Sequence, residues 1–168
     1  MSPEFRLARP ADAPPLRGLI ERAYRGDSAR QGWTNEADLL DDERTSDPEV
    51  AGLIVAADKR VLVAEQAGAL IGTVTATDLG GGRAYLGMLC VEPTLQAAGL
   101  GRDLIARIEQ IAARDFGAAM MEMTVIELRP ELIRYYERRG YRDTGERRPF
   151  PVPYPVDFAM VVLERAIG

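Results

Sequence analysis

The stretch LCVEPTLQAAGLGRDLIARIEQIAARDFG, Leu89 to Gly117, decides the expected fold of this chain. An apolar run ends at Pro93, a loop with two glycines follows, and an amphipathic segment begins near Leu100. This order predicts a β-strand that enters a tight loop and then an α-helix over 100–116. Gly117 stands where a left-handed C-terminal cap is expected.

The loop before this helix, QAAGLG, carries Gly99 and Gly101 at the helix entrance. The first amides of a helix have no partner within it, and the helix dipole adds about half a positive charge at that end. Glycines let an anion approach these amides without a Cβ in the way, and Arg102 can add a charged contact. The loop therefore predicts a phosphate or diphosphate site. The alternative, that the two glycines merely permit a turn, stays open.

Two known phosphate-binding loops do not fit this stretch. No GK[ST] follows the glycines, which excludes a P-loop nucleotide triphosphatase. A dinucleotide-binding fingerprint requires a third glycine, and Leu104 stands at that position.

Length and composition predict one soluble globular domain over residues 1–168. Hydrophobic residues make up 46% and charged residues 28%, and no apolar run approaches the ~18 residues of a membrane span. The N-terminus lacks the basic stretch and apolar core of a secretory signal, so we expect a cytoplasmic protein. The net charge of −5 argues against a nucleic-acid surface.

Histidine and cysteine are scarce in this chain, which limits the catalytic groups and metal sites that it can form. The chain has no histidine, which removes histidine-based triads, histidine metal sites and imidazole bases. Its one cysteine, Cys90, lies within an apolar run with no basic residue near it in sequence, so we expect it to be buried and inert. Such a composition suits a reaction whose reactive group arrives on a cofactor, and no metal site is expected.

The rest of the chain predicts a mixed α/β order. Helices are expected in the segments 13–25, 36–41, 47–58, 100–116 and 130–139. Strands are expected at 4–8, Val61–Gln66, Leu70–Thr77, 84–92, 118–126, 141–148 and 157–166. An irregular, proline-rich loop is expected over Phe150–Pro155.

The segment VEPTLQAAGLGRDLI resembles the acyl-CoA-binding signature of the GNAT family of N-acetyltransferases. That signature is a strand, V-x-P, then Q/R-x-x-G-x-G/A, then a helix. Val91, Pro93, Gln96, Gly99 and Gly101 occupy its positions here. The family often has glycine directly after the Gln or Arg, where this chain has Ala97.

A second segment, RPELIRYYERRGY, resembles the family's helix that ends in [FY]-Y-x-x-x-G-[FY]. Tyr136, Gly140 and Tyr141 take those positions, and Arg129 replaces an asparagine that the family often has. The resemblance implies an α/β (α+β) fold. It has a mixed, mostly antiparallel central sheet of about seven strands, flanked by about four helices.

The resemblance also implies a cofactor, acetyl-CoA, and direct transfer of its acetyl group to an amine. The pantetheine arm would lie between the strands at 85–91 and 120–126, with main-chain amides near Leu89 and Val91 polarising the thioester carbonyl. The expected cofactor-binding residues are Leu89, Val91, Gln96, Ala97, Ala98, Gly99, Leu100, Gly101, Arg102 and Tyr136.

The resemblance implies Tyr136 as the acid that protonates the departing thiolate. The chemistry allows this, since a tyrosine titrates near ~10 and a thiol near ~8.5. A plain core aromatic is the alternative, since Leu132, Ile133 and Tyr136 share one helical face. Tyr135 points about 100° away around the helix and is the poorer candidate.

The amine must lose a proton, and without histidine the base is a carboxylate, a tyrosine or water. Glu36 and Glu122 are the catalytic candidates, and Glu127 is a further candidate base. The expected substrate-binding residues are Trp33, Thr34, Glu36, Glu127, Arg129 and Phe150. The alternative for Thr34 and Glu36 is a capped helix start, and for Glu122 an exposed strand position.

The leading interpretation is an acetyl-CoA-dependent N-acetyltransferase acting on an amine of a small molecule or peptide. No nucleic-acid or membrane partner is expected, and a homodimer is left open. One alternative is an acyl-CoA-binding sensor without turnover. Another is an unrelated nucleotide-binding regulator.

Overall fold

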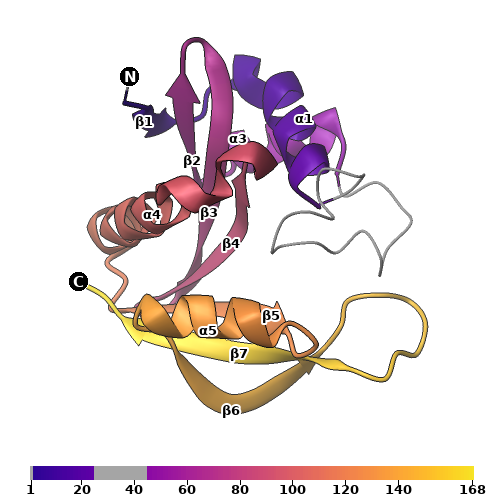
Figure 1. The fold of residues 1–168 in the computed structure, drawn as a ribbon. Helices are drawn as coiled ribbons and strands as arrows, with labels where there is room; N and C mark the ends of the chain where they lie inside the picture. The colour runs from indigo at the N-terminus through magenta and orange to yellow at the C-terminus, as the bar shows by residue number, and fades with distance from the viewer. Residues whose placement is uncertain (1, 25–44) are drawn as a thin grey trace.

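The structure is a computed structural model that describes residues 2–24 and 45–168. Its seven strands form one mixed sheet in the order β1-β2-β3-β4-β5-β7-β6, in which only β4 and β5 are parallel (Figure 1). The strands are β1 (Glu4–Leu7), β2 (Lys59–Gln66), β3 (Ala69–Gly80), β4 (Arg83–Val91), β5 (Met120–Ile126), β6 (Arg142–Pro149) and β7 (Ala159–Ala166). The expected mixed, mostly antiparallel sheet of about seven strands is confirmed.

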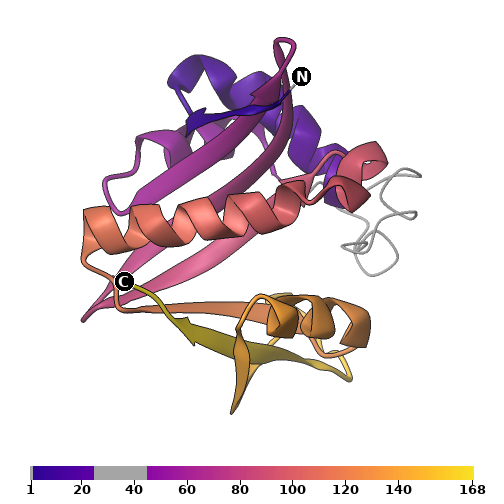
Figure 2. The ribbon, with the colours of Figure 1, turned by 60° about the vertical axis from the view of Figure 1, so that its left-hand side comes forward.

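Helices cover both faces of this sheet. Within the described residues they are η1 (Pro10–Asp12), α1 (Ala13–Tyr24), α3 (Asp47–Val55), η2 (Pro93–Ala98), α4 (Leu100–Phe116) and α5 (Pro130–Arg138). The helices α4 and α5 lie on one face, and α1 and α3 lie on the other (Figure 2). The expected helix over 36–41 lies outside the described residues.

The helix α4 has the bounds that its sequence predicts, Leu100–Phe116. Gly99 before it and Gly117 after it both have left-handed backbone, with φ of 79° and 62°. Its apolar residues recur at helical spacing, so Leu104, Ile105 and Ile108 are fully buried against the sheet.

The sheet opens between β4 and β5. These strands pair only from Arg83↔Met120 to Tyr85↔Glu122, and beyond that point they diverge (Figure 1). β4 also holds an extra residue relative to β3, since Thr73 pairs with Cys90 but Thr75 pairs with Gly87. This β-bulge bends β4 away from β5 and leaves a V-shaped gap in the sheet.

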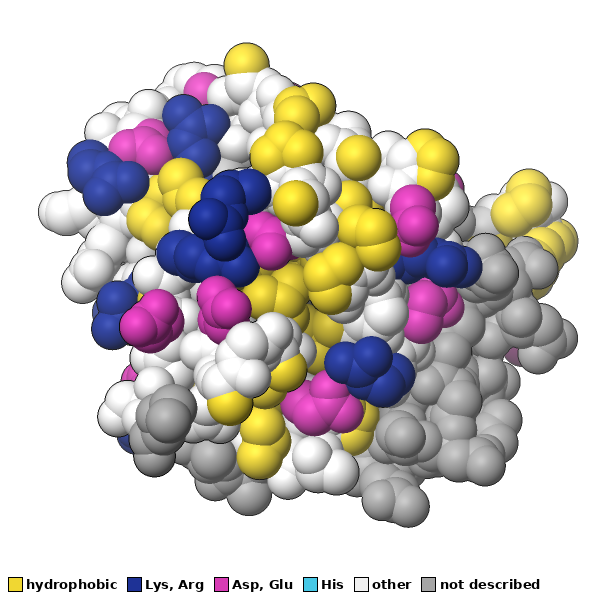
Figure 3. Space-filling model, turned by 90° about the horizontal axis from the view of Figure 1, so that it is seen from above, with side chains coloured by type: hydrophobic (Ala, Val, Ile, Leu, Met, Phe, Trp, Pro, Cys, Tyr) yellow, Lys and Arg dark blue, Asp and Glu magenta, His cyan; other side chains and the backbone are white. Residues whose placement is uncertain are grey.

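The surface in Figure 3 mixes Lys and Arg with Asp, Glu and hydrophobic side chains. The described residues on that face therefore form no continuous basic field of the kind that attracts nucleic acid. No helix in the described ranges has the length and apolar character needed to cross a membrane.

Candidate active site

A pocket lies where β4 and β5 separate and has a volume of about 250 Å³. Most of its lining side chains are apolar, as is typical of a small-molecule site. The lining residues are Tyr85, Leu86, Gly87, Met88, Leu89, Met123, Thr124, Val125, Ile126, Arg129, Leu132, Tyr136, Phe150, Pro151, Val152 and Met160.

Tyr136 reaches this pocket from α5. Its side chain is only 4% exposed, and its ring packs edge-on against Tyr135 and Tyr141, at centroid distances of 5.2 and 6.2 Å. Tyr136 therefore belongs to the core and also lines the pocket, and its role as the acid stays a prediction.

The β4 wall of the pocket is largely main chain. The bulge residue Met88 has a positive φ of 53°, which is uncommon for a residue with a side chain. Leu89 and Val91 bury their side chains on the α4 side of the sheet, and Leu89 also lines the pocket. This placement agrees with the expectation that the β4 backbone faces a ligand in the gap.

The entrance of α4 leaves several main-chain amides without a partner inside the helix. Asp103 N donates to Gly99 O at 3.2 Å, so the amides before it, from Leu100 to Arg102, lie at the open end of the helix. The Arg102 side chain is 65% exposed and lies beside that end. Gln96, Ala97 and Ala98 lie in η2, immediately before the turn.

The structure shows a second physical reason for Gly101, beside the expected approach of an anion, which stays a prediction. A Cβ at this position would lie 2.8 Å from the hydroxyl oxygen of Tyr135, so the glycine makes room for that tyrosine. Burial raises the pKa of Tyr135, and its ring lies under the guanidinium of Arg139 at 5.0 Å. The Tyr135 hydroxyl is therefore a neutral donor beside the α4 entrance, a placement that sequence reasoning missed.

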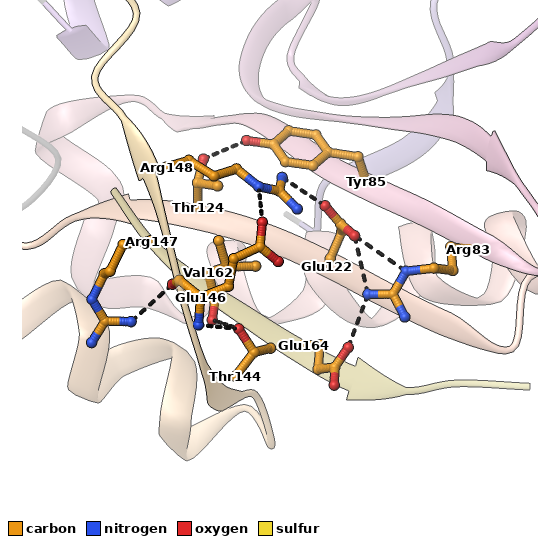
Figure 4. Close-up of polar contacts among 10 residues, drawn as sticks. All are labelled: Arg83, Tyr85, Glu122, Thr124, Thr144, Glu146, Arg147, Arg148, Val162 and Glu164. Atoms are coloured by element: carbon orange, nitrogen blue, oxygen red, sulfur yellow. Dashed lines mark hydrogen bonds and ion pairs between the residues drawn. The ribbon is translucent and has the colours of Figure 1, made fainter. Parts of the chain in front are cut away.

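Glu122 does not line the pocket. Its carboxylate accepts hydrogen bonds from Arg83 at 3.0 Å and from Arg148 at 2.8 Å, and the residue is 5% exposed (Figure 4). Arg83 also binds Glu164 at 2.9 Å, and Arg148 binds Glu146 at 2.8 Å. The geometry favours a structural role, and a role for Glu122 as a base stays a prediction.

The structure brings some of the expected substrate-binding residues together in the pocket. Arg129 and Phe150 line the pocket, and Phe150 packs against Phe158 with ring centroids 5.0 Å apart. Glu127 does not line it, because its Oε1 accepts from the backbone N–H of Ala159 at 3.0 Å. Trp33, Thr34 and Glu36 lie outside the described residues.

Two polar residues of the pocket were not expected. The hydroxyls of Tyr85 on β4 and Thr124 on β5 lie 2.5 Å apart, across the gap between the strands (Figure 4). Strand alternation could have placed Thr124 on the same face as Glu122, but only the strand pairing shows that Tyr85 reaches it.

A sheet split between two parallel strands, with a helix entrance and a buried tyrosine at the split, is the architecture of an acetyltransferase. The sequence model described as the Acetyltransferase (GNAT) family matches residues 20–141, and the chain belongs to this family. Members of this family use acetyl-CoA as the acetyl donor. The match contains both motifs, from Val91 to Tyr141.

Individual relatives agree with this assignment. An IAA acetyltransferase of Azospirillum brasilense is 32% identical over 105 residues, which cover 61% of this chain and 67% of the relative. The yncA protein from Salmonella typhimurium, solved with its cofactor acetyl-CoA, is 19% identical with a TM-score of 0.76, covering 100% of this chain and 95% of that one. The PaiA N-acetyltransferase from Thermoplasma acidophilum, in complex with coenzyme A, is 18% identical with a TM-score of 0.70, covering 99% of each chain.

Proposed function

We propose that this protein transfers an acetyl group from acetyl-CoA to an amine of a small molecule or peptide. The observation that carries the proposal is the pocket between β4 and β5, where Tyr136 meets the backbone around the bulge. The N-acetyltransferase name of the relative from Thermoplasma acidophilum supports an amine as acceptor.

The residues present fit coenzyme A. The amides from Leu100 to Arg102 and the exposed Arg102 side chain can hold its diphosphate, with the Tyr135 hydroxyl as a neighbouring donor. The gap between β4 and β5 can hold an extended arm, with the main chain around Met88 and Leu89 along one side. When bound, acetyl-CoA supplies an acetyl group activated as a thioester.

The residues that line the pocket bind and orient the acceptor amine and move protons. Tyr136 holds its hydroxyl proton in a buried position, from which it can be given to a departing sulfur. The apolar lining around Ile126, Phe150 and Met160 excludes water, which favours a neutral amine over an ammonium ion. Trp33, Thr34 and Glu36 remain predicted contributors to acceptor binding.

A thiol-release assay over a panel of amines tests this function. The wild type should free coenzyme A with at least one amine, and Tyr136→Phe should lower kcat by about 10²–10⁴-fold, since a positioned proton donor is lost. Calorimetry should show that Tyr136→Phe still binds coenzyme A.

Tyr141→Phe is the matched control. It keeps the aromatic ring beside Tyr136 but removes the hydrogen bond from the Tyr141 hydroxyl to Glu109, 2.7 Å long. This variant should lose stability while keeping kcat near the wild-type value. Tight binding of coenzyme A without turnover on any amine would instead support the sensor alternative.

A further inference from the structure

The Tyr85–Thr124 hydroxyl pair lies at a special point of the sheet. Tyr85 and Glu122 form the last register pair between β4 and β5, and the hydroxyl contact comes one step further into the gap. Figure 4 shows the two side chains turned toward each other from the two strands. The pair therefore marks the closed end of the V, inside the lining of the pocket.

The pair faces the opposite side of the sheet from Tyr136. Side chains alternate along a strand, and Met123 and Val125 pack into the core with Tyr136 and α4. Thr124 lies between them and points the other way, as does Glu122 two residues earlier. Among the described residues, the pocket thus has the Tyr136 hydroxyl on the α5 side and the Tyr85 and Thr124 hydroxyls on the other side.

Among the described residues, no carboxylate lines this pocket, and Arg129 is its one charged member. Glu122 is nearest in sequence to Thr124, but arginines occupy both of its carboxylate oxygens. A neutral amine that enters from the face opposite Tyr136 therefore meets hydroxyl oxygens as its polar partners.

We propose that the Tyr85–Thr124 pair receives and orients the acceptor amine, as a pair of positioning residues on the face opposite Tyr136. This inference rests on the proposed function. Each hydroxyl offers one donor and two acceptor sites, and their mutual bond uses one of each. The remaining lone pairs accept the N–H groups of the amine and leave its own lone pair directed into the gap.

The groups already named account for the bonds and protons of the acetyl transfer. The amine nitrogen forms a bond to the acetyl carbon, and the bond from that carbon to sulfur breaks. The nitrogen, hydrogen-bonded to the hydroxyl oxygens, loses one proton to water. The sulfur gains one proton from Tyr136, which solvent then reprotonates. Two acceptor oxygens match two N–H groups, so a primary amine is the favoured substrate class over a secondary amine.

The test compares Tyr85→Phe, Thr124→Val and the double variant in the thiol-release assay, using the most active amine of the panel. Each single variant should lower kcat/KM for the amine about 10- to 100-fold, because a polar partner of the amine is lost. The double variant should lose little more, because the two hydroxyls act as one unit. Thr124→Ser, which keeps the hydroxyl, should retain most of the activity.

The affinity for coenzyme A separates this role from a merely structural bridge between the strands. If the pair only positions the amine, all variants keep the wild-type dissociation constant for coenzyme A. Removal of the hydroxyls should then reduce the preference for primary over secondary amines. Equal losses in coenzyme A affinity and in amine kcat/KM would overturn the proposal, as would wild-type kcat/KM in Tyr85→Phe. A wild type that acetylates no amine would overturn the proposed function as well.

Discussion

At the scale of single residues, the two glycines at the entrance of α4 show how closely it is packed. Gly99 is needed for its left-handed backbone, with φ of 79°, whereas Gly101 is needed for the space that Tyr135 fills. The two glycines of the motif therefore answer two different physical demands. A small residue at 101 couples the first turn of α4 to α5, which also carries Tyr136.

Gly101→Ala should weaken this coupling. The new methyl group would lie 2.8 Å from the Tyr135 hydroxyl oxygen, and relieving such overpacking costs about 1–3 kcal/mol. We expect lower stability in urea unfolding and weaker binding of coenzyme A in calorimetry.

The double variant Gly101→Ala, Tyr135→Phe is the control for this contact. It removes the hydroxyl oxygen that would clash with the new methyl group, so part of the lost stability should return. The free energies of unfolding of the two changes should then deviate from additivity by about 0.5–3 kcal/mol. Strict additivity of the two changes would show that the contact is not the cause.

At the scale of elements, charged side chains connect four strands at the closed end of the V-shaped gap. Glu122 on β5 binds Arg83 on β4 and Arg148 on β6, and Arg83 also binds Glu164 on β7. The main-chain ladder between β4 and β5 ends at this point. The cluster therefore holds the strands together where the ladder stops, next to the hydroxyl pair.

Glu122→Gln should destabilise the protein by about 1–3 kcal/mol, since a buried acceptor of two arginines loses its charge. Glu164→Gln is the matched control, because Glu164 is 33% exposed and such pairs contribute about 0–1 kcal/mol. Urea unfolding of both variants measures the difference. If Glu122 were instead the catalytic base, kcat would fall sharply at unchanged stability.

At the scale of the whole molecule, the strands form two groups whose backbone ladders join only where β4 pairs with β5 over three register positions, while α4 contacts both groups. One group is β1 to β4 with α1, α3 and α4, and the other is β5 to β7 with α5 (Figure 2). The pocket draws its lining from both groups. A ligand in the gap therefore adds contacts between the two groups.

Coenzyme A should stabilise the fold by about 2.7 kcal/mol at a concentration of 100 times its dissociation constant. Hydrogen exchange should slow along β4 beyond Tyr85 and at the first amides of α4. Pantetheine, which lacks the diphosphate, should protect the α4 amides far less at the same concentration. Equal protection by both ligands would contradict the assignment of the diphosphate to α4.

The sequence by itself determined the elements and their order, because periodicity, glycines and prolines act locally. It predicted the bounds of α4, the strand before it and the loop over Phe150–Pro155, and its two motifs predicted the family. It also placed Tyr136, Arg129 and Phe150 among the site residues, and all three line the pocket.

Only the tertiary structure decided how residues far apart in the chain meet. The contact between Tyr85 and Thr124, the arginines around Glu122 and the space that Gly101 leaves for Tyr135 each join separate elements. The reason is physical: strand pairing and helix packing fix distances between distant residues, whereas local pattern fixes only the face on which each side chain lies.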